Sequence, residues 1–148
     1  MVIEYSYLIP IVPIFAFICI AVFGKRSKEG GGYVSILSVG LSFIISLFVF
    51  IETLKGERSE ISISWFGLGS IEFELGILID QLSALMLLLV SLIGLIVVIY
   101  SLGYMHGDEG LRRYYAEITL FIGVMLGLVC ANNYLLLYIF WELVGVCS

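Results

Sequence analysis

The dominant pattern in this sequence is a series of five apolar segments, each ended by charged or turn-forming residues. We expect helices over residues 7–24, 33–54, 82–104, 114–131 and 134–148. The first four have about 17–25 residues, which is the length needed to cross a hydrocarbon core about 30 Å thick. The fifth reaches Ser148 after only about 22 Å of helix at 1.5 Å per residue. The sequence therefore predicts an N-terminal fragment of a larger membrane subunit, with its fifth helix truncated.

A different pattern separates the second and third segments. Residues 61–65 and 71–75 alternate strictly between apolar and polar side chains, on either side of a glycine-containing stretch. Such alternation around a turn predicts a β-hairpin over about 61–75. We expect the hairpin outside the hydrocarbon, because lipid does not tolerate open sheet edges. The predicted fold is an all-α integral membrane protein, a single domain over residues 1–148 with about five transmembrane helices and a short extracytoplasmic hairpin.

Composition supports a membrane protein, since 61% of the residues are hydrophobic and only 13% are charged, against about 25% charged in an average soluble domain. The net charge is −5 and there is no basic patch, so we expect no nucleic-acid partner. The predicted partner is the lipid bilayer of a cell membrane or an inner mitochondrial membrane.

Lysine and arginine predict the orientation. The first and third loops hold five of these residues and the loop with the hairpin holds two, so the first and third loops are expected on the cytoplasmic side. The N-terminus and the hairpin are then expected outside.

The sequence indicates no cofactor or metal site in this chain. It has no P-loop, no GxGxxG and no cysteine cluster. Cys19, Cys130 and Cys147 lie far apart in apolar segments, which favours small buried side chains over a disulfide framework or a metal site.

Glu142 is the strongest candidate for chemistry, because it is a lone acid in the unbroken apolar run from Tyr134 to Ser148. In a helix from Tyr134 it lies about 12 Å deep. An ionised carboxylate there costs roughly 2.5–3.5 kcal/mol, and such residues usually find a partner and mark an ion or proton route. No lysine lies in any apolar segment, so a cationic partner must come from elsewhere. A structural acid that hydrogen-bonds a neighbouring helix or subunit is the alternative.

Other polar positions have structural interpretations. Asp80, three residues before Ser83, is expected to cap the third helix, and Asn133 is expected to cap the fifth. Glu117 follows Arg113 by one turn and is predicted to form a surface ion pair. The small residues Gly123 and Gly127, like the stripe of Ser38, Ser42 and Ser46, predict close helix packing within the subunit.

The sequence resembles the N-terminal part of the antiporter-like subunit L, or chain 5, of respiratory complex I and of F420H2 dehydrogenases. The resemblance lies in four stretches: Ile79–Ser83, Gly103–Gly110, Arg113–Tyr115, and Asn133–Ser148 with its Trp-Glu-Leu-Val-Gly-Val-Cys-Ser ending. The family commonly has an acid where this chain has Asn132 or Asn133.

This resemblance implies a membrane-arm subunit that contributes to proton translocation coupled to quinone or methanophenazine reduction by NADH or F420H2. Other membrane-arm subunits would be its partners, and quinone and electrons would be handled outside this chain. It also implies that Glu142 pairs with a lysine on a later helix and helps to gate proton movement.

Two alternatives remain open at the level of sequence. The same glutamate and fold occur in subunits of multisubunit sodium/proton antiporters and membrane-bound hydrogenases. A membrane scaffold that transports nothing by itself is the other alternative.

Overall fold

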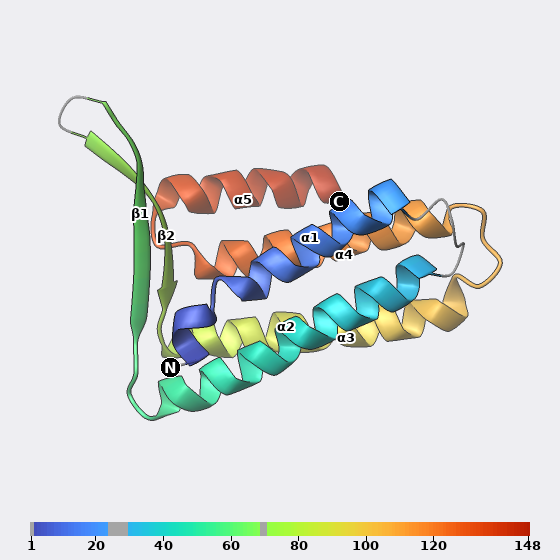
Figure 1. Cartoon of the computed structure of the whole chain (residues 1–148), viewed down its shortest axis with the longest axis horizontal. Helices are drawn as coiled ribbons and strands as arrows, with labels where there is room; N and C mark the ends of the chain where they lie inside the picture. The colour runs from blue at the N-terminus through green and yellow to red at the C-terminus, as the bar shows by residue number, and fades with distance from the viewer. Residues whose placement is uncertain (1, 24–29, 69–70) are drawn as a thin grey trace.

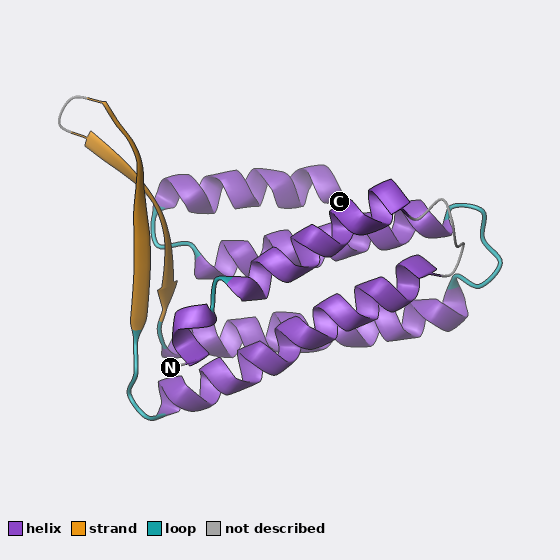
Figure 2. Ribbon diagram, viewed as in Figure 1, coloured by secondary structure: helices purple, strands orange, loops and turns teal. Residues whose placement is uncertain are grey.

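The computed structural model describes residues 2–23, 30–68 and 71–148, and it consists of helices with one small sheet (Figures 1 and 2). A short 3₁₀ turn at Val2–Tyr5 precedes five α-helices. These are α1 (Leu8–Phe23), α2 (Gly30–Leu54), α3 (Gln81–Tyr104), α4 (Leu111–Cys130) and α5 (Tyr134–Cys147). The predicted helices are thus confirmed, with ends that move by at most three residues.

Three of the five helices are long and apolar enough to cross a membrane, namely α2, α3 and α4. The sequence pattern predicted that the first segment would also reach this length. In the described residues, however, α1 has only 16 residues and belongs with α5 among the shorter apolar helices. The predicted class, an all-α membrane protein, is therefore confirmed.

The helices run up and down in one bundle, and the hairpin lies across one of its ends (Figure 1). The N-terminus and the turn between α4 and α5 lie at that same end, as the predicted topology requires. The loop between α3 and α4 lies at the opposite end. The buried core combines side chains from all of α1 to α4, including Ile9, Val39, Leu87 and Leu126.

The hairpin is longer than the alternation predicted. Its strands are β1 (Ser59–Leu68) and β2 (Ile71–Ile79), which pair in antiparallel register from Ser59 opposite Ile79, with an irregularity after Ser64. The prediction that it ends near residue 75 was wrong because the apolar run 75–79 does not alternate. That run stays in the strand because it packs on the bundle: Ile79 is fully buried, and Ile77 forms a β-bridge with Ala131.

Two glycines one turn apart on α4 pack against two different helices. A Cβ atom at Gly123 would lie 2.9 Å from Cγ1 of Ile14 in α1 and 3.1 Å from the Ile14 backbone nitrogen. A Cβ atom at Gly127 would lie 2.6 Å from the ring of Phe140 in α5. The GxxxG spacing therefore serves packing within the subunit, as small residues in membrane helices often do.

Ser42, in the serine stripe of α2, supplies a hydrogen-bond donor that α1 lacks. Pro13 lies inside α1 and has no N–H, so the helix cannot supply a donor to the carbonyl of Ile9, four residues earlier. The hydroxyl of Ser42 donates a hydrogen bond to that carbonyl at 2.8 Å, and Ser42 is fully buried. A neighbouring hydroxyl of this kind is one way a proline is tolerated in a membrane helix.

Replacing Ser42 with alanine should lower the free energy of unfolding by about 1–2 kcal/mol, because it leaves the buried Ile9 carbonyl without a donor. In a Pro13→Ala background residue 13 regains its N–H, so the same substitution should cost almost nothing. Denaturant unfolding in detergent micelles would measure both costs. An equal cost of Ser42→Ala in the two backgrounds would contradict this account.

Candidate functional site

Glu142 lies on a face of α5 that no other described element covers. The helix has no buried residue, and Glu142 itself is exposed. Its neighbours on the uncovered surface include Trp141, which is 61% exposed, and Tyr138, which is 54% exposed. Because α4 is the main helix on which α5 packs in the described residues, an acid on the open surface of α5 is available to a group outside them.

Tyr138 precedes Glu142 by one helical turn, and this spacing of four residues places the two side chains side by side on α5. A phenol can only donate to an ionised carboxylate, so the Tyr138 hydroxyl can partly compensate the acid but supplies no positive charge. This pair was not predicted from the sequence.

No lysine lies within the five helices. The three lysines of the sequence, Lys25, Lys28 and Lys55, fall between the helical segments. A carboxylate in hydrocarbon costs several kcal/mol unless it is paired or protonated. The site can therefore do two things: take up a proton, or pair with a cation from another segment or subunit.

The α4–α5 turn fixes the end of α5 that lies beside the hairpin. Asn133 is the N-cap residue of α5, and its side-chain oxygen accepts a hydrogen bond from the Leu136 N–H at 2.8 Å, as predicted. The Asn133 side chain also donates to the Asn132 side-chain oxygen at 2.7 Å. The bond from Leu136 satisfies a backbone N–H that a helix start leaves without a partner.

The same turn is joined to the hairpin. The Asn132 N–H donates to the Gly76 carbonyl at 3.2 Å, and the neighbouring bridge joins Ile77 to Ala131. A Cβ atom at Gly76 would collide with the side chain of Asn132. The hairpin therefore holds the first turn of α5, and with it the helix that carries Glu142. The contact between Asn132 and Gly76 was not predicted from the sequence, because the two residues are 56 positions apart.

Asp80 has the structural role that the sequence predicted. Its carboxyl oxygen accepts from the Ser83 backbone N–H at 2.7 Å, and its own N–H donates to the Ser83 hydroxyl at 2.7 Å, which forms a capping box at the start of α3. The hydrogen bonds from the Ser83 backbone and side chain stabilise the charged carboxylate and lower the pKa of Asp80 below 3.8. Asp80 is thus a helix cap at the hairpin end of the bundle.

The remaining candidates form no second polar centre. Arg113 and Glu117 pair at 2.6 Å between Nε and Oε1, as predicted, but the arginine side chain is 84% exposed, so the pair contributes little to stability. All three cysteines are free. Across residues 2–23, 30–68 and 71–148, no group of three or more histidine, cysteine or acidic side chains could hold a metal ion.

Comparison with known proteins confirms the resemblance found in the sequence. The family described as NADH-ubiquinone oxidoreductase (complex I), chain 5 N-terminus, matches residues 65–115. Subunit L of the F420H2 dehydrogenase of Methanosarcina mazei is 42% identical over 147 residues. That similarity covers 98% of this chain and 21% of the relative.

Photosynthetic organisms contain similar proteins. The chloroplastic NAD(P)H-quinone oxidoreductase subunit 5 of Adiantum capillus-veneris is 37% identical over 153 residues, covering 98% of this chain and 21% of that protein. Chain 5 of the Synechocystis NAD(P)H-quinone oxidoreductase is also 37% identical over 153 residues, covering 98% of this chain and 22% of that protein. The chain thus spans about a fifth of these relatives, and the similarity includes the first two helices, where the sequence motifs were weakest.

Gly76→Ala should lower the free energy of unfolding by about 1–3 kcal/mol, because the added methyl group overpacks the contact with Asn132. Combining it with Asn132→Ala should recover most of this loss, since the truncated side chain leaves room for the methyl group. Thermal unfolding of the two single variants and the double variant would measure the coupling.

Gly103→Ala is the matched control, because no atom lies within 4 Å of a Cβ at that position. It should be neutral or slightly stabilising, as alanine favours a helix. Strictly additive effects of Gly76→Ala and Asn132→Ala would argue against the proposed contact between hairpin and turn.

Proposed function

We propose that this chain, which is similar over almost its whole length to complex I chain 5 and F420H2 dehydrogenase subunit L, serves proton translocation coupled to quinone reduction. In that family the full-length subunits are antiporter-like and lie in a membrane arm. This chain would supply the first helices of such a subunit and one ionisable end of its proton channel.

The observation that carries the proposal is the position of Glu142. It is an acid in an apolar helix, it lies on a surface that the described residues leave open, and the neighbouring Tyr138 can offer it a hydrogen-bond donor but no charge. An intramembrane acid in such a setting is a functional candidate with a missing partner. The resemblance to the family implies that this partner is a lysine on a later helix.

A glutamate and a lysine at this site would act as a proton switch. When the ammonium group is close, it favours the ionised carboxylate; when it moves away, the carboxylate in its apolar surroundings favours the protonated form. A change in the separation of the two groups therefore moves a proton onto or off Glu142. The hairpin and the α4–α5 turn would hold the glutamate in place while the partner moves.

The redox chemistry would take place in other subunits. The sequence has no P-loop, no GxGxxG and no cysteine cluster, in keeping with the proposal that electrons from NADH or F420H2 reach quinone or methanophenazine in those other subunits. Other membrane-arm subunits and the lipid bilayer would be the partners of this chain. We further propose five crossings of a cell or inner mitochondrial membrane, with the N-terminus and hairpin outside, in keeping with the basic loops.

Glu142→Gln should strongly reduce proton translocation while electron transfer and assembly continue, because glutamine keeps the size of the side chain but cannot carry the proton or the charge. The measurement is proton uptake into vesicles that contain the assembled complex, compared with its quinone reductase rate. Glu142→Asp should retain part of the translocation.

Glu117→Gln is the control, since it makes the same chemical change on α4 and removes only an exposed ion pair. It should leave the ratio of protons to electrons unchanged. Normal pumping by the Glu142→Gln complex would rule out the proposed role of this residue.

A further inference from the structure

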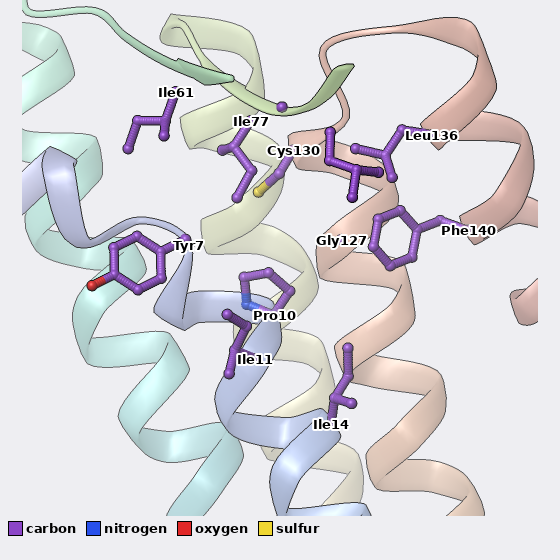
Figure 3. Close-up of a pocket in the computed structure, with 12 residues that line it drawn as sticks. Tyr7, Pro10, Ile11, Ile14, Ile61, Ile77, Gly127, Cys130, Leu136 and Phe140 are labelled. Atoms are coloured by element: carbon purple, nitrogen blue, oxygen red, sulfur yellow. The ribbon is translucent and has the colours of Figure 1, made fainter. Parts of the chain in front are cut away.

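A large apolar cavity lies between the helices beneath the hairpin. Its volume is about 490 Å³, and its walls come from α1, β1, β2, α4 and α5. Figure 3 shows Pro10 and Ile11 on one side, Leu136 and Phe140 on another, and Ile77 above them. None of the lining residues is charged. Glu142 and its neighbour Tyr138 do not line this cavity.

The cavity exists because α1 and α5 are held apart on the same helix. Both pack closely on α4, at Gly123 and Gly127, but they make few contacts or none with each other. The result is a crevice between α1 and α5 that has α4 as its floor. Strand β2 closes it at the hairpin end, where Gly76 is joined to the α4–α5 turn.

Neither water nor a void suits this crevice. An ordered water needs two to four polar partners, but the Gly76 carbonyl already accepts from Asn132 and the hydroxyl of Tyr7 points away from the other lining residues (Figure 3). Leaving the space empty would deprive its apolar walls of their dispersion contacts. The chemistry of the lining therefore calls for a hydrocarbon.

We propose that one hydrocarbon chain of a membrane lipid, from the leaflet on the hairpin side, occupies the crevice between α1 and α5. Helices of the membrane domain form most of the walls, so the crevice lies where such chains are most concentrated. The lipid chain would bridge Ile11 and Leu136, which the protein itself leaves out of contact, and would support α5 from the side opposite its open face.

The shape of the crevice favours a lipid chain over a protein segment. A helix with side chains is about 10–12 Å wide, and β2 blocks its continuation at the hairpin end. A flexible acyl chain can enter from the bilayer and end beneath the strand.

The test uses the full chain in phosphatidylcholine/phosphatidylglycerol vesicles that contain a phosphatidylcholine with a diazirine in the middle of one acyl chain. After irradiation, mass spectrometry locates the lipid adducts. They should be enriched on residues 10–14 and 136–140 relative to the exposed surface of α3. Leu136→Trp fills the cavity and should reduce this enrichment several-fold.

Leu137→Trp is the matched control, because it makes the same change on the same helix at a residue that does not line the cavity. It should leave the enrichment intact. Ile11→Trp fills the crevice from its opposite wall and serves as a second variant should Leu136→Trp fail to fold.

Three results would overturn the proposal. The first is uniform labelling of all exposed apolar surfaces in the wild-type chain, and the second is equal enrichment in the filled and control variants. The third is loss of labelling with an unlabelled long-tailed quinone but not with excess phosphatidylcholine, which would assign the crevice to a quinone tail.

Discussion

The close approach of two helices to α4 is the constraint on which the rest of the structure depends. Gly123 and Gly127 lie one helical turn apart on α4. The absence of a side chain lets α1 approach at Gly123 and α5 approach at Gly127. Apolar side chains gain nothing by leaving lipid for another apolar surface, so membrane helices associate through tight packing and hydrogen bonds. A side chain at either glycine would push away one of the two helices that flank α4. The position of α5, and hence that of Glu142, follows from this contact.

The second requirement is that backbone polar groups find partners inside the bilayer. Three local arrangements meet it at sites where the helices alone would fail. Ser42 supplies the donor that Pro13 lacks, Asp80 and Ser83 cap α3, and Asn133 caps α5. The hairpin adds the bond from Asn132 to Gly76, so that the end of α5 is held by both strand and cap. Glu142 is thereby carried on a helix fixed at one end and on one face, while its other face stays open.

Local features could be predicted from the sequence and distant contacts could not. The helices, the two caps and the Arg113–Glu117 pair depend on residues within a few positions of one another, and all are confirmed. The GxxxG spacing indicated that Gly123 and Gly127 pack closely against other helices, but not that each glycine contacts a different helix. The extension of β2 to Ile79 was missed because the strand there is stabilised by the α4–α5 turn rather than by alternation. The crevice between α1 and α5 likewise has no sequence signature, since it arises from where two helices dock.

The central claim is that Glu142 gains and loses a proton as the complex turns over. Infrared difference spectroscopy of the assembled complex, recorded on addition of the electron donor, tests this most directly because protonated carboxyl groups have a separate C=O stretching band. The account predicts a band that appears or disappears during turnover in the wild-type complex and is absent from the difference spectrum when residue 142 is glutamine. An identical carboxyl difference spectrum in the two complexes would contradict it.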